Sequence, residues 1–179
     1  MEVKTLVVGD LKENCYIVSK DNTCLIVDPG SEFNKIDEYI EKNKYKVLGI
    51  LITHYHFDHI SALKLLQEKY RVNVIDFNNI GKQIIDTFDF EVIPFKGHKE
   101  DLVCFYFEKE NIMFTGDFIF KGSIGRVDLP GGNALEMKDS LKKITKFSLN
   151  TILYPGHGDK TTLKEEINNN PYLLENRCF

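Results

Sequence analysis

The chain has 179 residues, of which 42% are hydrophobic, and a formal net charge of -4. This length and composition suit one sizeable hydrophobic core, so we expect a single domain over residues 1–179. The acidic balance and the scattered placement of the 23 basic residues argue against nucleic acid or an anionic membrane as the main partner.

The predicted elements alternate between strands and helices along the chain. Apolar runs bounded by polar turns predict strands, and apolar residues at helical spacing predict helices. The predicted strands are Val3–Val8, Cys15–Ser19, Thr23–Val27, Leu48–Ile52, Val72–Ile75, Phe90–Phe95, Leu102–Phe107, Asn111–Phe114 and Thr151–Tyr154. The predicted helices are Phe33–Lys44, a segment that begins at Asp58 and keeps helical spacing to Tyr70, and Ala134–Phe147. Strands interleaved with a few helices indicate a layered α/β or α+β domain.

The four cysteines bear on the redox compartment. They are Cys15, Cys24, Cys104 and Cys178, without any Cys-x-x-Cys spacing, and the first three lie in strand-like apolar runs. Reduced and mostly buried thiols are therefore expected rather than a disulfide framework. Because no signal-peptide pattern opens the chain and no apolar run approaches the ~20 residues of a membrane helix, we predict a cytoplasmic protein. Leu102–Phe107 is apolar throughout, which is typical of a strand covered on both faces.

All five histidines occupy positions that suit a metal site. They are His54, His56 and His59, in the run Thr-His-Tyr-His-Phe-Asp-His at residues 53–59, and His98 and His157, which each follow a glycine. Alternation along an extended segment puts His54 and His56 on one side. Asp58 and His59 then turn away at the start of the predicted helix, where they can serve a second metal. A neutral imidazole nitrogen is well suited to bind a transition metal, so this cluster predicts a metal centre.

Four strand-like runs each end in a residue of a metal-ligand type. These residues are His54, His98, Asp117 and His157, and glycine directly precedes the last three. Taken singly, each of those three also fits an ordinary turn or surface position. Glycine permits the sharp turns and close approach that converging loops need. If the strands share a direction, their ends meet at one sheet edge and gather the four residues.

The motifs together resemble those of the metallo-β-lactamase fold superfamily. The signature is the Thr-His-x-His-x-Asp-His run at residues 53–59. Four further segments occur in the order that the superfamily shows: Val27–Gly30, Gly97–His98, Thr115–Asp117 and Tyr154–Gly158. More narrowly, Gly122–Gly132, His157–Thr162 and Asn170–Leu173 resemble the short bacterial glyoxalase II-like hydrolases, which are also called hydroxyacylglutathione hydrolases.

The resemblance implies an α+β fold, the four-layer αββα metallo-β-lactamase sandwich, with the metal site along one edge. It implies two divalent metal ions, by default zinc, with iron and manganese able to use the same ligands. The first metal would be held by His54, His56 and His98, the second by Asp58, His59 and His157, and both by Asp117. It further makes Asp58 and Asp117 the catalytic carboxylates. The C-terminal helical domain with which full-length glyoxalase II binds glutathione is not expected here.

The implied function is metal-dependent hydrolysis of a small-molecule thioester, such as S-lactoylglutathione or a related acyl-thiol, by a metal-activated hydroxide. A persulfide dioxygenase-like oxidoreductase with one iron is an alternative. A lactonase or β-lactamase-like hydrolase is another, because the same nucleophile opens cyclic esters and amides. A non-catalytic metal-binding domain is the alternative from outside the enzymes. The sequence does not predict an oligomeric state.

Several residues beside the ligands keep two interpretations. Asp28 is either the hydrogen-bond partner of a ligand histidine or a turn residue before Pro29 and Gly30. Arg126 either anchors a substrate carboxylate or braces its loop by pairing with Asp128. Phe118 and Phe120 line the pocket or pack in the core. The segment Lys99-Glu100-Asp101 departs from the superfamily's usual sequence after the third histidine, which predicts a loop of different shape near the metal edge.

Overall fold

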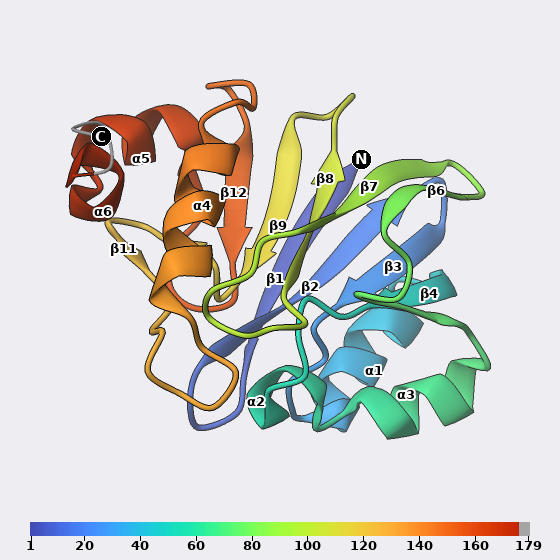
Figure 1. The fold of residues 1–179 in the computed structure, drawn as a ribbon. Helices are drawn as coiled ribbons and strands as arrows, with labels where there is room; N and C mark the ends of the chain where they lie inside the picture. Colours follow the sequence, from blue (N-terminus) through green and yellow to red (C-terminus); the bar gives the residue numbers. More distant parts are fainter. Residues whose placement is uncertain (176–179) are drawn as a thin grey trace.

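Two β-sheets form the centre of the computed structural model, which describes residues 1–175 (Figure 1). The first sheet has the order β1 (Glu2–Val8), β2 (Glu13–Lys20), β3 (Thr23–Val27), β4 (Lys46–Leu51) and β5 (Val74–Ile75). The second has the order β13 (Thr161–Thr162), β12 (Ile152–Pro155), β9 (Ile112–Gly116), β8 (Val103–Phe107), β7 (Phe88–Pro94) and β6 (Gly81–Ile85). A small ribbon pairs β10 (Ile119–Phe120) with β11 (Ser123–Ile124).

Helices cover the outer face of each sheet (Figure 1). Those on the first sheet are α1 (Phe33–Lys42), α2 (Phe57–Ile60) and α3 (Leu63–Tyr70). Those on the second are α4 (Ala134–Ile144), α5 (Leu163–Asn169) and α6 (Pro171–Glu175). In the described part of the chain, no helix is both long and apolar enough to cross a lipid bilayer.

Three hydrophobic clusters correspond to the three spaces between the layers. The central cluster packs Val18 and Leu25 of the first sheet against Phe105 and Phe114 of the second. One outer cluster joins the first sheet to α1 and α3, and the other joins the second sheet to α4 and α6. Burying a side chain such as Phe or Leu contributes about 1.5–3 kcal/mol, so these clusters are the main source of cohesion. The predicted four-layer αββα architecture is confirmed.

Strand β8 is buried at every position, as its sequence predicted for a strand covered on both faces. The thiols of Cys15, Cys24 and Cys104 are free and buried, as expected, whereas Cys178 lies outside the described residues. Burial raises the pKa of Cys104 well above its usual value. A thiol in this state is held neutral and inert.

The helix predicted from Asp58 is interrupted at Ser61 and Ala62, which separate α2 from α3. The amides of these two residues donate to the carbonyls of Gly30 (3.1 Å) and Pro29 (3.0 Å) rather than continuing the helical ladder. The turn at residues 28–30 therefore holds the end of α2 in position by tertiary hydrogen bonds. The spacing of apolar residues along the sequence cannot predict such contacts.

Other boundaries differ where local contacts override the pattern. Helix α1 ends at Lys42 rather than Lys44, because Lys44 adopts a left-handed conformation with φ 55°. Strand β7 begins at Phe88 and pairs with β6, which the sequence prediction missed, as it missed α5 and α6. Strand β6 alternates half-buried and exposed residues at the edge of its sheet and has little apolar signal.

Candidate metal centre

The seven predicted ligand residues lie together at one edge of the sandwich. The segment 54–59 follows β4, His98 follows β7, Asp117 follows β9 and His157 follows β12. Strands β9 and β12 are parallel and end side by side, with Gly116 paired to Pro155. Figure 1 shows α2 at the end of the sandwich toward which these two strands run. The convergence of strand ends predicted from the sequence is thus present.

Two glycines let the backbones approach this closely. Gly116 has φ +48°, and a Cβ there would lie 2.4 Å from the hydroxyl oxygen of Thr53. A Cβ at Gly156 would lie 2.3 Å from Asp117 Oδ1 and 2.6 Å from His59 Cε1. Since real Cβ atoms need more than 3 Å, a side chain at Gly116 would displace Thr53, and one at Gly156 would push Asp117 and His59 apart.

Three imidazoles form the first group of donors. The Nδ1 atom of His56 is 3.0 Å from His54 Nε2 and 2.9 Å from His98 Nε2. The three nitrogens all lie within 4.8 Å of one another. A tetrahedral zinc ion with Zn–N bonds of ~2.0–2.1 Å places its ligand nitrogens about 3.3 Å apart. The spacing therefore fits a metal ion with small adjustments.

A second group is formed by Asp58, His59 and His157. Asp58 Oδ2 is 3.3 Å from His157 Nε2 and 3.9 Å from His59 Nε2. One oxygen of Asp117 faces this group, since Oδ1 is 3.4 Å from His59 Nε2 and 3.7 Å from His157 Nε2. Its other oxygen, Oδ2, is 3.6 Å from His98 Nε2 in the first group. Asp117 is thus placed between the two groups.

The other ring nitrogen of four histidines contacts an acceptor. The Nδ1 atoms of His98 and His157 face the carbonyls of Arg126 (2.8 Å) and Leu11 (3.1 Å). His59 Nδ1 faces Asp28 Oδ2 at 3.0 Å, and His54 Nδ1 faces the Thr53 hydroxyl at 3.1 Å. Each contact favours the tautomer that carries its proton on Nδ1. The Nε2 lone pair is then free and directed toward the site, as in metal-binding histidines.

Asp28 fills both of the roles considered from the sequence. It adopts a left-handed conformation with φ 48° at the turn before Pro29 and Gly30. Its Oδ2 atom meets His59 Nδ1 and accepts from the Thr53 hydroxyl at 2.6 Å, and its Oδ1 accepts from the Thr53 amide at 2.7 Å. Because Thr53 also contacts His54, this one carboxylate orients a histidine in each group of donors.

Burial and neighbouring charges shift the pKa values of the site. Burial, with nearby His59 and His98, lowers the pKa of His54 well below its usual value and keeps this ring neutral. Burial opposes protonation of His59 too, but the carboxylates of Asp117 and Asp28 outweigh it and raise its pKa well above normal. Contact with Asp58 raises the pKa of His157. In the metal-free protein the second group therefore holds protons that a metal ion would displace.

Two buried atoms of the predicted ligand residues have no hydrogen-bond partner in the described part of the chain. They are His59 Nε2 and Asp117 Oδ1. An unpartnered buried polar atom costs about 1–3 kcal/mol. A divalent metal ion would remove that cost at both atoms, so the residues present fit the predicted ions.

Glu13 is a residue of this site that the sequence prediction missed. It is 1% exposed at the start of β2, its Oε1 is 3.8 Å from His59 Nδ1, and both its carboxylate oxygens lack partners among the described residues. Burial raises its pKa to about 10. The neighbouring Asn14 donates to the carbonyls of Pro155 (3.0 Å) and Gly158 (2.8 Å), which ties β2 to the His157 loop. The available signal in the sequence was the pair Glu13 and Asn14, two polar residues directly before the apolar run of β2.

A cavity of about 520 Å³ opens over the donors. Its lining residues are Leu11, His56, Phe57, Asp58, His98, Asp117, Phe120, Ile124, Gly125, Arg126, Leu129 and His157. Phe120 therefore lines the pocket, whereas Phe118 is fully buried in the core. The Arg126 side chain pairs with Asp128, and its backbone carbonyl meets His98. Of the two interpretations of Arg126, the pairing with Asp128 within its own loop is the one that the structure contains.

Comparisons with known proteins identify the family of the chain. The family model of the metallo-beta-lactamase superfamily matches residues 8–92 and 71–157. A "probable metallo-hydrolase" of Bacillus subtilis is 31% identical over 97% of this chain and 98% of its own. The hydroxyacylglutathione hydrolase GloC of Haemophilus influenzae is 27% identical over 97% of this chain and 98% of its own.

Solved structures are similar along the whole fold. BLEG-1, a B3 metallo-beta-lactamase, superposes with a TM-score of 0.93 at 28% identity, covering 96% of this chain and 99% of its own. TTHA1623 in a di-iron-bound form superposes with a TM-score of 0.88 at 30% identity, covering 96% of this chain and 100% of its own. The sequence, the four-layer fold and the clustered donors lead to one conclusion: the chain belongs to the metallo-beta-lactamase superfamily, a family of metal-binding hydrolases.

Proposed function

We propose that this chain is a dinuclear metal-dependent thioesterase, with S-lactoylglutathione or a related acyl-thiol as the substrate type. The observation that carries the proposal is the position of Asp117, whose two oxygens face two separate groups of donors. The relative named hydroxyacylglutathione hydrolase GloC supports a thioester as substrate. The description of TTHA1623 as di-iron-bound supports a two-metal centre.

Each donor has a role in this proposal. His54, His56 and His98 would hold one ion, Asp58, His59 and His157 the other, and Asp117 both. When bound, paired divalent ions supply an activated water nucleophile and stabilise charge on the substrate carbonyl. Asp58 lines the cavity, which supports a role in which its carboxylate accepts a hydrogen bond from the attacking water and orients it.

The thiolate leaving group of a thioester does not need a proton donor from the protein. A thiol has a pKa of about 8.5, so a thiolate departs without a proton donor. Among the cavity-lining residues, all within the described part of the chain, we find no lysine, tyrosine or cysteine to serve as such a donor. This lining suits a thioester better than an amide, whose amine must be protonated as it leaves.

We take zinc as the native metal. Histidine and carboxylate donors also accept iron and manganese, and the order of metal affinities does not select among them. The di-iron form of TTHA1623 makes iron the principal competitor.

The one-iron oxidoreductase remains the second candidate considered from the sequence. Such a centre needs only two histidines and one carboxylate, whereas seven donors converge here. The additional group of Asp58, His59 and His157 favours two ions. Lactones and β-lactams fit the same nucleophile and serve as comparison substrates.

The test is elemental analysis of the purified protein together with hydrolysis assays on a panel of thioesters, lactones and β-lactams. We expect about two metal ions per chain and the highest kcat/KM on a thioester. A single iron per chain with no thioester cleavage would refute the proposal. Two bound ions with no hydrolysis of any panel member would favour a metal-binding domain without catalytic activity.

A further inference from the structure

We infer that the thiol part of the substrate is uncharged and apolar, so that this cavity selects against free glutathione thioesters. The inference rests on the proposed thioesterase function, and of the substrate types named there it favours an acyl-thiol other than S-lactoylglutathione. It is carried by two features of the cavity, namely the apolar side chains of its lining and the pairing of Arg126 with a carboxylate of the same loop.

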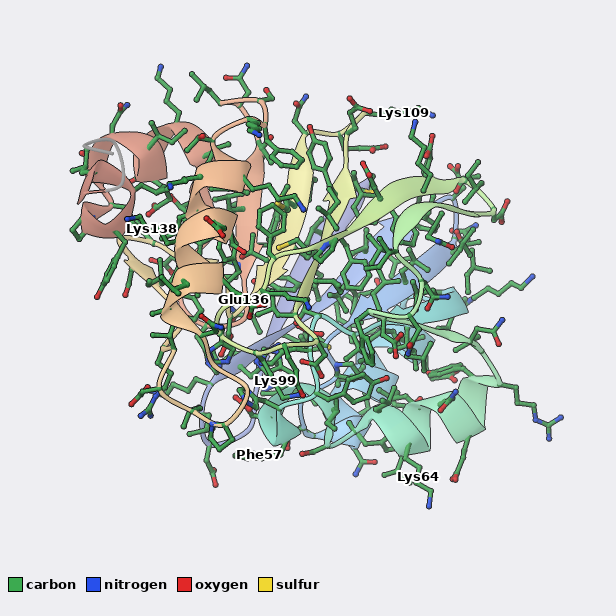
Figure 2. The ribbon with its side chains drawn as sticks, viewed as in Figure 1. Phe57, Lys64, Lys99, Lys109, Glu136 and Lys138 are labelled. Atoms are coloured by element: carbon green, nitrogen blue, oxygen red, sulfur yellow. The ribbon has the colours of Figure 1, made fainter. Side chains whose placement is uncertain are left out.

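The rim of the cavity is apolar. Leu11, Phe57, Phe120, Ile124 and Leu129 line it above the metal donors. Leu11 is 55% exposed and Phe57 is 70% exposed, although both are large hydrophobic residues. Figure 2 shows Phe57, the first residue of α2, at the lower edge of the molecule. Exposed apolar groups gathered around a pocket mark a surface that an apolar ligand covers.

Arg126, which lines the cavity, is already paired with a carboxylate. Among the lining residues, all of which the structure describes, Arg126 is the only lysine or arginine. Two of its three guanidinium nitrogens meet Asp128, at 2.8 Å from Nε to Oδ1 and 2.8 Å from Nη2 to Oδ2. This bidentate pair already balances the charge of Arg126, so a substrate carboxylate that approached this residue would compete with the carboxylate of Asp128.

Lys99, in the loop that follows His98, repeats the arrangement. Its Nζ lies 2.7 Å from Asp101 Oδ2, again a carboxylate two residues along the chain. That carboxylate is fixed in turn, because its Oδ2 also accepts from the Tyr55 amide at 3.3 Å. Gly131 packs against the same loop, since a Cβ on this glycine would lie 3.6 Å from Lys99 Cγ. Arg126 and Lys99 thus each have a carboxylate of their own.

A glutathione thioester carries two carboxylates on its thiol part. To bind them, the protein would have to bring them up to cations that already have a carboxylate partner, or leave them against Leu11, Phe57 and Leu129. Leaving a charged group without a partner costs at least ~1–3 kcal/mol. An uncharged thiol chain covers the same apolar groups without that cost.

The experiment compares two ligands with one skeleton. N-acetyl-S-hexylglutathione and its diethyl ester differ by two negative charges, and neither can be hydrolysed as a thioester. Isothermal titration calorimetry on the metal-loaded protein should give at least about tenfold tighter binding of the diester. Turnover is measured in parallel on the S-acetyl thioesters of N-acetylglutathione and of its diethyl ester.

Two variants locate the effect. Asp128→Asn frees Arg126 and should tighten binding of the diacid several-fold while leaving the diester unchanged. Asp89→Asn is the matched control, since it removes the same charge and breaks the exposed Asp89–Lys109 pair (2.6 Å), which lies away from the cavity. Figure 2 shows Lys109 at the opposite end of the molecule from Phe57. This control should change neither affinity.

Equal or tighter binding of the diacid would overturn the inference, and an additional loss of that binding in Arg126→Ala would assign the anion to Arg126. Binding of neither ligand would also overturn it, because the cavity would then not be a thiol subsite. Diester-selective binding without turnover of either S-acetyl thioester would uphold the cavity's selectivity and refute the thioesterase function instead.

Discussion

Two buried glutamates, in two regions of the molecule, differ in the hydrogen bonds that their side chains accept. Glu166 lies in α5, against the second sheet, and accepts hydrogen bonds from Thr161 Oγ1 (2.7 Å), the Gly122 amide (2.8 Å) and Asn170 Nδ2 (2.9 Å). Glu13 lies beside the metal donors, and its two oxygens have no partner among the described residues. Both side chains belong to residues that are 1% exposed.

The number of hydrogen bonds that each side chain accepts distinguishes Glu166, a structural residue, from Glu13, which belongs to the metal centre. Glu166 accepts hydrogen bonds from three neighbouring groups and joins the β10–β11 ribbon to the C-terminal helices. Glu13 is surrounded by Asp28, Asp58 and Asp117, which raise its pKa further, while only His59 opposes them. Such an arrangement is stable when positive charge is present nearby, and two divalent ions would supply it.

The largest effect on metal content and activity is expected when one of the predicted metal ligands is removed. His56→Ala removes the nitrogen that meets both His54 and His98, so the first group can no longer close around an ion. We expect metal loss and the abolition of turnover, with retention of the fold. Elemental analysis, thioester assays and far-UV circular dichroism measure these three properties. Metal content and activity equal to the unaltered protein would refute the ligand assignment.

Glu166→Ala tests the structural half of the comparison. It strands three donors, Thr161, Gly122 and Asn170, and should lower the free energy of unfolding by about 2–4 kcal/mol. Urea denaturation of the metal-free protein measures the change. The metal affinity of the folded protein should stay the same, and a parallel loss of affinity would show that the two regions are coupled.

Asp28→Asn weakens the support of both donor groups while leaving every proposed ligand in place. An asparagine side chain offers one acceptor oxygen where the carboxylate serves Thr53 and His59 with two. We expect metal affinity to fall about 10–100-fold, as measured by competition with a chelator. Asp37→Asn is the control, because Asp37 is bonded to Tyr70 in the helical layer instead. Unchanged affinity in Asp28→Asn would mean that ligand orientation does not depend on this carboxylate.

Glu13→Gln probes the charge of the site through pH and has the smallest expected effect. The folded metal-free protein keeps a proton on Glu13 up to a pKa of about 10, whereas the unfolded chain releases it near 4.5. The folded state thus binds more protons in this window, and its stability falls as the pH rises.

Glutamine does not titrate, so the variant's stability advantage in chelator should grow as the pH rises from 5.5 to 9. Denaturation curves at both pH values measure it. Parallel stability curves for the two proteins would show that Glu13 does not carry the extra proton.

Local signals in the sequence predicted a layered domain and the convergence of ligand-type residues at strand ends, whereas the resemblance to the metallo-β-lactamase superfamily implied the four-layer architecture and the set of seven donors. The run at residues 53–59 is contiguous, and His98, Asp117 and His157 each terminate a strong apolar run. Whether these seven bind the ions stays a prediction.

Features that depend on distant contacts were not predictable in the same way. The break between α2 and α3 requires the carbonyls of Pro29 and Gly30, which belong to another loop. Glu13 joins the site only because β2 lies beside the His157 loop, where Glu13 and His157 form an isolated antiparallel bridge. The pairing of Arg126 with Asp128 was one of two open alternatives, and a spacing of two residues alone does not reveal a rotamer.

The donors come from both sheets, and this has a consequence for the lifetime of the protein. The segment 54–59 leaves the first sheet, whereas His98, Asp117 and His157 leave the second. Ions bound among them would clamp the halves of the sandwich together, and by mass action would add about 2.7 kcal/mol of stability at a free-metal concentration of 100 Kd. The abundance of the protein in a cell would then follow the supply of metal, and starvation for the ion would remove the protein as well as its activity.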